Sequence, residues 1–387
     1  MLVLLYIDLN DFPTARDVTY MNSASISLMP KPAINSMIEF EQKIASGGTI
    51  GFDEDEETRA LEGARDEAAT LLGAERDEIA VLSSATQGIG SLAWSLSLKS
   101  GSNVVSTDAE FPSVVYPWLR LSHEKSLEVR LARNHDGLVS EAELEKLVDD
   151  HTAVISISQV EYGTGQRFDL HWLADLAHSH GALLVVDATQ SAGLLPIDVH
   201  AEDVDALVAG GYKGLLGPFG AAIFFLKEEI AKSLTPSLVG WRTTPVPYDL
   251  DATKLSFAGS VRKFEYSTMS YASAVGLAES MRYLRRLGYR NASEYVLNLT
   301  DRFLRIVGDN PDLPERAALT PKDKNHHASI ASFRFKERDQ SAIVADLVKR
   351  NIIVSQRFNG IRFSFHVYNN EQDLAKANQA LEELLVK

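Results

Sequence analysis

The sequence predicts an α/β fold with a mostly parallel, doubly wound sheet, followed by a smaller α+β unit. Short apolar runs alternate with segments of helical composition from residue 78 to residue 226, and this order is typical of parallel sheets. The runs at 182–186 and 206–209 are wholly apolar, as expected for strands that are buried on both faces. After about residue 290 helices and strands alternate again, which indicates the second unit.

The larger unit is expected to follow a loop at 20–30 and a helix that begins after Pro32. Its strands are expected at 78–82, 103–107, 127–131, 154–160, 182–186, 206–209 and in the apolar run that ends at Leu226. Its helices are expected at 53–72, 89–98, around 116–118, at 140–148 and from Asp169 to His180. Ser140 and Glu143 have the spacing of a capping box, and Asp169 can cap the helix that follows it.

The smaller unit is expected to begin after a proline-containing segment, 235–259, and a helix at 270–287. Segment 235–259 is too long for a tight connection and is therefore expected to be functional. Strands are predicted at 328–335, 352–355 and 361–365.

Composition narrows the class of protein. The 387 residues, 45% hydrophobic and 24% charged, are typical of a soluble globular protein with two domains. The net charge of −15 argues against a nucleic-acid partner. Without cysteine the chain has no disulfide, thiolate metal site or thiol nucleophile, and no His-Glu-x-x-His or EF-hand pattern predicts a metal. The apolar start, residues 1–7, is short and lacks a basic residue, so we expect no signal peptide or membrane span and a cytoplasmic protein.

A lysine and an aspartate follow two neighbouring strands of the predicted sheet. Asp187 ends the run 182–186, and Lys213 comes after the run 206–209 and two glycines. Open α/β sheets bind ligands at this edge. The pair is either a salt bridge, or the lysine that forms a Schiff base with pyridoxal phosphate together with the carboxylate that pairs with the pyridinium nitrogen.

The turn at 83–88 leads from a strand into a helix and carries small hydroxyl residues. The free N–H groups and the dipole of a helix start can bind an anion such as a phosphate. Ordinary N-capping by Ser84 or Thr86 explains the same residues equally well.

The segment from Asp205 to Lys213, with the Gly-Pro-Phe-Gly that follows, resembles the lysine signature of the class V aminotransferases, although Tyr212 stands where many members have histidine. Glu-Phe-Pro-Ser at 110–113 with Tyr-Pro-Trp at 116–118 looks like the isopenicillin N epimerase-like and cysteine desulfurase-like branch. Residues 362–369 resemble the family's R-x-S-x-x-x-Y-N segment.

This resemblance implies fold type I of the pyridoxal-phosphate enzymes, with a seven-stranded sheet. It divides the chain into an N-terminal segment 1–18, a cofactor-binding domain 19–287 and a small domain 288–387. It implies pyridoxal 5'-phosphate as the cofactor, Lys213 as the catalytic residue, and a homodimer in which Thr268 reaches the partner's cofactor phosphate. The cofactor-binding residues that it implies are Ala85, Thr86, Gln87, Phe111, Tyr162, Asp187, Gln190, Tyr212, Lys213 and Thr268.

By this resemblance, Phe111 stands where the family has the residue that stacks on the cofactor ring. Arg362 stands where the family has the arginine that binds the substrate carboxylate, and Ser25 is expected beside it. Alternatively, Phe111 belongs to the core and Arg362 is a strand arginine that faces solvent. The planar guanidinium suits a carboxylate because it can bind both oxygens.

The resemblance predicts an aminotransferase that acts on a small amino acid. A C–S β-lyase or an epimerase of the same family is the alternative, and a non-catalytic cofactor-binding protein is another. A cysteine desulfurase that forms a persulfide needs a protein thiol, which this chain lacks.

Overall fold

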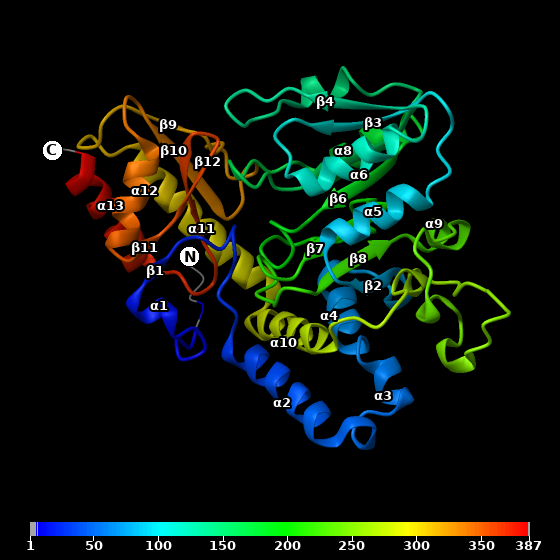
Figure 1. The fold of residues 1–387 in the computed structure, drawn as a ribbon. Helices are drawn as coiled ribbons and strands as arrows, with labels where there is room; N and C mark the ends of the chain where they lie inside the picture. Colours follow the sequence, from blue (N-terminus) through cyan, green and yellow to red (C-terminus); the bar gives the residue numbers. More distant parts are fainter. Residues whose placement is uncertain (1–4, 6, 386–387) are drawn as a thin grey trace.

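The computed structural model describes residue 5 and residues 7–385, so most of the predicted apolar start, residues 1–4 and 6, lies outside the described residues. The chain folds around a seven-stranded sheet and a separate four-stranded sheet (Figure 1). None of the helices in the described part is long and apolar enough to cross a membrane.

The seven-stranded sheet has the order β2-β8-β7-β6-β5-β3-β4. Its strands are β2 (Ile79–Leu82), β3 (Ser102–Thr107), β4 (Leu127–Ala132), β5 (Thr152–Ser158), β6 (Leu183–Asp187), β7 (Ala206–Gly210) and β8 (Ala222–Leu226). Only β8 runs antiparallel to its neighbours. The prediction of a mostly parallel α/β sheet is therefore confirmed.

Two layers of helices cover this sheet because successive strand residues point to opposite faces. Ile79 and Val81 of β2 pack with α4 (Glu62–Leu72), α8 (Leu170–His178) and α10 (Tyr271–Leu287), whereas Ala80 and Leu82 pack with α5 (Ala85–Ser95) and α6 (Pro112–Ser122). Both faces are apolar, as the unbroken hydrophobic runs predicted.

The four-stranded sheet is antiparallel and has the order β12-β13-β10-β9. Its strands are β9 (Arg316–Ala318), β10 (Ile330–Phe335), β12 (Ser355–Arg357) and β13 (Gly360–Ser364), and α11 (Tyr289–Gly308), α12 (Gln340–Lys349) and α13 (Glu371–Leu385) pack against it. The short strand β1 (Thr19–Tyr20) pairs with β11 (Ile352–Ile353), and Phe12, close to α1 (Thr14–Asp17), lies in this core. Residues 12–21 thus pack on the C-terminal unit, while the division at residue 288 stays a prediction.

Two local expectations are wrong. Residues 53–72 form two helices, α3 (Glu54–Arg59) and α4, rather than one. The predicted capping box does not form: Ser140 precedes the short helix α7 (Glu141–Glu145), but its side chain accepts no hydrogen bond there. The side chain of Glu143 instead pairs with Lys146. Asp169, in contrast, caps α8 as expected, because its carboxylate accepts from the N–H groups of His171 and Trp172.

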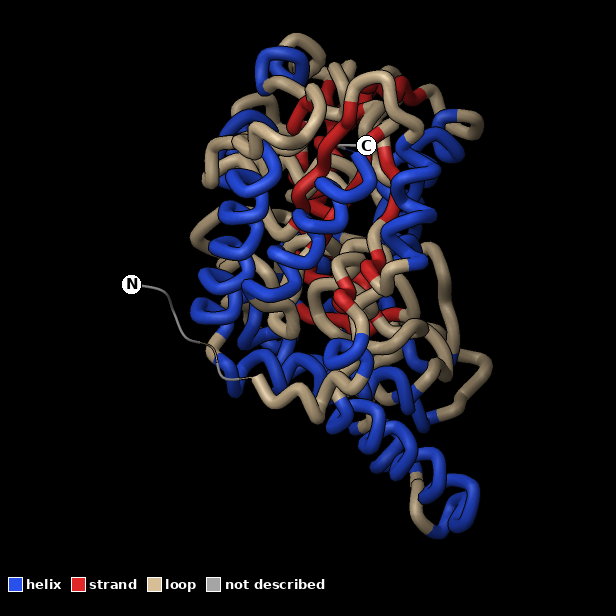
Figure 2. The backbone as a smooth tube through the Cα atoms, turned by 90° about the vertical axis from the view of Figure 1, so that its left-hand side faces the viewer, coloured by secondary structure: helices blue, strands red, loops and turns tan. Residues whose placement is uncertain are grey.

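Helix α2 (Lys31–Gly47) lies at the edge of the molecule. Figure 2 shows it extending from the body at the lower end, with its last turn leading into the short turn η1 (Gly48–Ile50). Ala33 is the one buried residue of α2. Near its start the helix packs on α10, where a Cβ at Gly276 would lie 2.5 Å from the sulfur of Met37.

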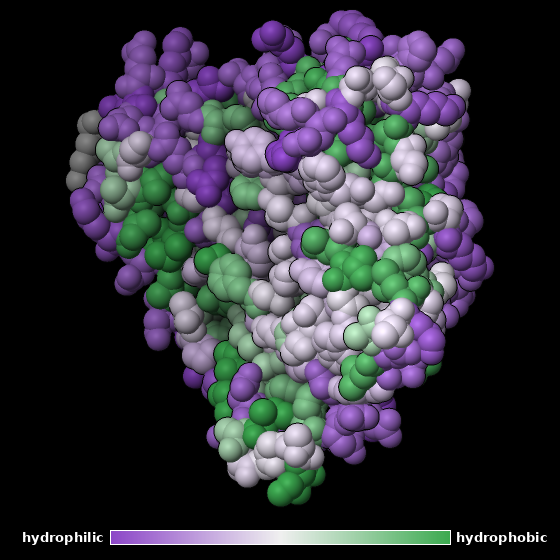
Figure 3. Space-filling view, turned by 45° about the vertical axis from the view of Figure 1, so that its right-hand side comes forward, coloured by the Kyte–Doolittle hydropathy of each residue, from purple (hydrophilic) through white to green (hydrophobic). Residues whose placement is uncertain are grey.

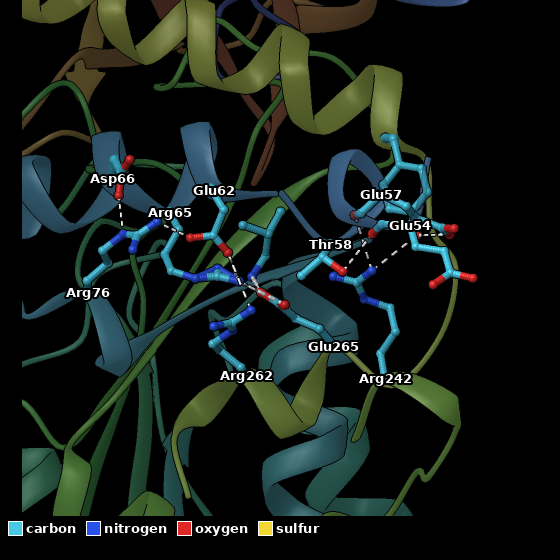
Figure 4. Close-up of polar contacts among 12 residues, drawn as sticks. Glu54, Glu57, Thr58, Glu62, Arg65, Asp66, Arg76, Arg242, Arg262 and Glu265 are labelled. Carbon is cyan, nitrogen blue, oxygen red and sulfur yellow. Dashed lines mark hydrogen bonds and ion pairs between the residues drawn. The ribbon is translucent and has the colours of Figure 1, made fainter. Parts of the chain in front are cut away.

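The segment after β8 carries α9 (Glu228–Ser233) and the short helical turns η3 (Trp241–Thr243), η4 (Pro247–Asp249) and η5 (Val261–Phe264). Figure 4 shows the charged contacts that attach it to α3 and α4. Glu265 accepts two hydrogen bonds from Arg65 Nη2, at 2.8 and 2.9 Å, and a third from the N–H of Val81 at 2.8 Å. Arg242 Nη1 lies 3.4 Å from the carbonyl oxygen of Glu57.

Removal of the Glu265 carboxylate should destabilise the fold strongly, because the buried Arg65 would keep only its longer contact with Glu62, at 3.6 Å. We expect Glu265→Ala to lower the free energy of unfolding in urea by about 3–5 kcal/mol. The control is Asp346→Ala, which breaks an exposed ion pair with Lys349 and should cost less than about 1 kcal/mol. Equal losses for the two variants would contradict this role of Glu265.

Candidate active site

The candidate site lies at the carboxyl ends of β5, β6 and β7, beside the start of α5. One pocket there is lined by Ser84, Ala85, Thr86, Phe111, Ser113, Ser158, Tyr162, Asp187, Thr189, Gln190, Gly210, Tyr212 and Lys213. Eight of the predicted site residues are thus brought together from five separate segments. The other four predicted site residues do not line this pocket: Gln87, Thr268, Ser25 and Arg362. The side chains of Gln87 and Thr268 contact Ser83 and Trp241 instead.

Lys213 and Asp187 do not form the salt bridge that the sequence left open. Within the described residues, no oxygen of a carboxylate lies within 4.0 Å of the Lys213 Nζ atom. The Asp187 carboxylate instead accepts from the N–H of Thr189 at 2.8 Å. The Lys213 ammonium lies 5.4 Å from the centre of the Phe111 ring and 5.5 Å from that of Tyr212. The ammonium of Lys213 therefore lies near two aromatic rings and forms no direct ion pair with Asp187, although the charge of this carboxylate acts on it.

The pKa of Lys213 is lowered to about 8, primarily because the side chain is only 8% exposed. The carboxylate of Asp187 opposes this shift, and the positive charges of Arg362 and Arg357 add to it. Burial raises the pKa of Asp187, whereas its hydrogen bonds with Thr189 and the charge of Lys213 lower it. Near neutral pH, Lys213 can thus exchange its proton more readily than an exposed lysine.

The start of α5, where an anion site is predicted, lies at the pocket. Ser84 is the N-cap, and its hydroxyl accepts from the N–H of Gln87 at 3.1 Å. Thr86 is not a cap, since its hydroxyl donates to Ser113 Oγ at 2.8 Å across the pocket. The amide oxygen of Gln87 accepts from Ser83, so this side chain turns to the preceding residues. Capping and anion binding are compatible here, because the remaining N–H groups of the first turn have no partner within the helix.

Aromatic rings form one wall of the pocket. Phe111 is 42% exposed, so the alternative that it belongs to the core is wrong. Its ring centre lies 5.6 Å from that of Tyr162, and the ring of Tyr162 lies equally far from that of Phe358. The side chain of Gln190 is buried and donates to the carbonyl oxygen of Ala24 at 3.0 Å.

Arg362 comes from β13 of the other sheet and is 1% exposed, so it does not face solvent as a simple strand arginine. Its Nη1 donates to the carbonyl oxygen of Tyr162 at 2.5 Å, its Nη2 to Ser25 Oγ at 2.5 Å and its Nε to Ser355 Oγ at 3.1 Å. Burial and the charge of Arg357 lower the pKa of Arg362, but a guanidinium stays charged. All of these acceptors are neutral, so the arginine has no anionic partner among residue 5 and residues 7–385.

The sequence did not reveal the two glutamates behind the pocket. The carboxylate of Glu110 accepts from the N–H and the hydroxyl of Ser158, at 2.5 and 2.6 Å. Burial raises the pKa of Glu110 to about 8 and raises that of Glu161 as well. Glu161 Oε2 is buried without a hydrogen-bond partner. Glu110 opens the Glu-Phe-Pro-Ser segment, but no pattern in the sequence shows that it and Glu161 are buried together, because this depends on how β3 and β5 meet.

Thr268 lies at the surface, outside the pocket, where its hydroxyl accepts from Trp241 Nε1 at 3.3 Å. No group of three His, Asp or Glu side chains among residue 5 and residues 7–385 could hold a metal ion.

These residues fit a ligand with an anionic group, an aromatic ring and a carbonyl. A helix start faces the pocket, and Phe111 exposes its ring. Lys213 and Arg362 are buried cations, and neither forms an ion pair with a carboxylate of the described part of the chain. A buried charge is costly unless it is paired, and ligand groups could supply the missing partners. The chemistry of the residues therefore fits pyridoxal phosphate and an amino acid.

Comparison with known proteins agrees with this fit. The family model of the class V aminotransferases matches residues 19–376. A probable cysteine desulfurase of Methanothermobacter thermautotrophicus is 27% identical over 97% of this chain and 96% of that protein, and the uncharacterized aminotransferase YcbU of Bacillus subtilis is 28% identical over the same shares. The apo structure of a cysteine desulfurase from Thermococcus onnurineus NA1 matches with a TM-score of 0.88 at 25% identity, and 99% of each chain is covered.

The charges around Lys213 should move its pKa in opposite directions. We expect Asp187→Asn to lower it, because a negative charge favours the ammonium, and Arg362→Gln to raise it. Titration of the apoprotein by NMR, after reductive methylation of the lysines with ¹³C, would follow each residue, and the Lys213→Ala variant would identify the signal. A Lys213 signal that titrates near the ordinary 10.5 in all variants would contradict the account.

Proposed function

Because the chain belongs to the class V aminotransferase family of pyridoxal-phosphate enzymes, we propose that it is an aminotransferase acting on a small amino acid. The observation that carries this proposal is the pair of buried cations, Lys213 and Arg362, that face the same region without carboxylate partners. One suits the cofactor's aldehyde, and the other suits the carboxylate of an amino acid.

In this proposal the cofactor is held by main-chain and side-chain groups at both ends of the pocket. Ala85 and Thr86 at the start of α5 would bind its phosphate through their N–H groups. The hydroxyl of Thr86, which donates to Ser113, and the N–H of Gln87, which donates to Ser84, would bind it by exchanging these partners for the phosphate. Phe111 and Tyr212 would flank its ring, and Tyr162 and Gln190 would bind its phenolic oxygen. The cofactor, when bound, supplies an electron sink for the carbanion at the substrate α-carbon.

Asp187 would pair with the ring nitrogen and keep it protonated. In the protein alone, burial raises the pKa of this carboxyl, which is unfavourable for its ionised form. A positive partner within hydrogen-bond distance would reverse this effect. A protonated nitrogen that binds beside Asp187 would therefore stabilise the ionised carboxylate.

Lys213 would attach the cofactor and then move the α-proton as a general base. A base works best when its pKa lies close to the working pH. Burial and the neighbouring arginines lower the pKa of Lys213 toward that range. Arg362 would bind the substrate carboxylate. Its Nη2 donates a hydrogen bond to Ser25 Oγ, which holds Ser25 beside the guanidinium.

A second candidate is a C–S β-lyase, which the relatives favour. The relative from Methanothermobacter thermautotrophicus and the structure from Thermococcus onnurineus NA1 are both named as cysteine desulfurases. This chain cannot form the protein persulfide, because it contains no cysteine, but sulfur can leave by β-elimination without a protein thiol. Epimerisation needs the same first deprotonation and belongs to the same alternative. A binding protein without turnover is less well supported, since it would not need the carboxylate partner Arg362.

We further propose that the protein acts as a homodimer in the cytoplasm. Large apolar side chains are exposed along the segment after β8: Leu238, Val239, Val246, Leu250 and Leu255. Figure 3 turns this side of the molecule forward and shows hydrophobic groups among polar residues. We propose that a second copy covers them and that Thr268, which contacts Trp241 of this segment, then reaches the partner's cofactor phosphate.

Lys213→Ala should abolish covalent attachment of the cofactor. Borohydride treatment of the wild-type protein followed by peptide mapping is expected to find the cofactor on the Lys213 peptide. The variant should lose at least about a hundredfold in turnover, since proton transfer is lost. Lys232→Ala, at an exposed lysine on α9, serves as the control and should behave as wild type. Labelling at another lysine would refute the assignment.

The type of reaction can be read from the fate of the amino group. With a ¹⁵N-labelled amino acid and an unlabelled 2-oxo acid, an aminotransferase should move the label into the new amino acid. A β-lyase would release it as ammonium, and an epimerase would leave it in place while the chirality is lost. Mass spectrometry of the products distinguishes the three outcomes, and ammonium as the sole labelled product would replace the aminotransferase proposal by the lyase.

A further inference from the structure

The hairpin between β12 and β13 carries a strained phenylalanine close to the candidate site. Arg357 pairs with Gly360, so Phe358 and Asn359 alone form the turn, and their φ angles are +46° and +57°. Such two-residue turns favour Asn-Gly, and a bulky residue at positive φ costs of order 1–3 kcal/mol. A phenylalanine at this position therefore calls for a role that offsets its strain.

The ring of Phe358 packs against the segment that carries Tyr162. The two ring centres lie 5.6 Å apart. Gly163 makes room for the phenylalanine, since a Cβ at this glycine would lie 2.2 Å from the Phe358 ring. Because Tyr162 also contacts Phe111, the hairpin tip extends the aromatic wall of the pocket.

Arg357 lies on the same face of the hairpin as Arg362. Ser355 pairs with Arg362 and accepts a hydrogen bond from it, and Arg357 is two residues further along β12. Residues two apart in a strand point to the same face. Arg357 Nη1 donates to the carbonyl oxygen of Gln356 at 2.6 Å, and none of the described carboxylates lies within 4.0 Å of its guanidinium.

Three cations thus gather in a protein whose net charge is −15. The charge of Arg357 acts on Lys213, Arg362 and Tyr162, and it shifts the pKa of each of them. Asp187 acts on Lys213, and burial raises the pKa of Glu110 to about 8, but neither of these carboxyls forms an ion pair with Arg357. Once the substrate's α-carboxylate binds Arg362, the charge of Arg357 is still without an anion.

We propose that Arg357 binds a second carboxylate, at the end of the substrate's side chain. This inference rests on the proposed function for the amino-acid substrate and narrows it to dicarboxylic amino acids. The aliphatic part between the two carboxylates lies against Phe358 and Tyr162, which explains why the turn keeps an aromatic residue despite the strain.

The test is binding of simple dicarboxylates to the holoenzyme, measured by isothermal titration calorimetry. Succinate, glutarate and adipate are compared with butyrate, valerate and hexanoate, which have the same chain lengths but one carboxylate. At least one dicarboxylate should bind about tenfold or more tightly than its matched monocarboxylate, as a hydrogen-bonded charge pair predicts. Arg357→Gln should remove this difference and leave the monocarboxylates unchanged, and Arg357→Lys should retain part of it.

Two further variants complete the experiment. Arg305→Gln, at an exposed arginine on α11, is the matched control and should retain the wild-type preference. Phe358→Asn should raise the melting temperature, because asparagine tolerates positive φ, and should weaken binding of every carboxylate in the series.

The proposal is overturned if no dicarboxylate binds more tightly than its matched monocarboxylate, or if Arg357→Gln weakens both kinds equally. The result is separate from the proposed function, because binding of dicarboxylates requires no turnover. If the protein prefers dicarboxylates but transfers no amino group, Arg357 binds a carboxylate as proposed, and the proposal that the protein is an aminotransferase is wrong.

Discussion

The candidate site depends on two buried cations, Lys213 and Arg362, that form no ion pair with any carboxylate of the described residues. A charge withdrawn from water is costly unless it is paired, so a fold that keeps both without a carboxylate must support them in another way. Neutral oxygens surround the guanidinium of Arg362, and aromatic faces lie near the ammonium of Lys213. The site therefore favours anionic or carbonyl ligands, because such ligands can supply the partners that these two cations lack in the protein alone.

Neutral hydrogen bonds hold the two sheets together around these cations. The Nδ1 of His366 accepts from the N–H of Val367 at 2.8 Å, so the proton on Nε2 can donate to the carbonyl oxygen of Gly214, which lies 3.1 Å away. Burial lowers the pKa of His366 to about 4, which keeps the ring neutral. On the other side of the loop, the N–H of Ser27 donates to the carbonyl oxygen of Tyr212 at 2.9 Å. The loop that carries Lys213 is thus fixed to the same unit that carries Arg362, without adding further charge.

Much of this arrangement could be predicted, because it follows from periodicity and from chain position. Buried strands that end in Asp187 or lead to Lys213 bring polar groups to one edge of a parallel sheet, and this topology needs no detailed packing. The resemblance to the class V aminotransferases supplied Arg362, which no local pattern distinguishes from a strand arginine. Arg357, Phe358 and Glu110 were missed, since their roles depend on which face of a hairpin meets which loop. The break between α3 and α4 was missed for a related reason: the composition there favours a helix throughout.

The most direct test of the central claim is a crystal structure of the protein grown with pyridoxal phosphate. The account predicts continuous density between the cofactor and Lys213 Nζ, the phosphate at the start of α5, and the ring nitrogen beside Asp187, with Arg362 facing the open side. Density for the cofactor on another lysine, or with its phosphate at the Arg362 guanidinium, would contradict it.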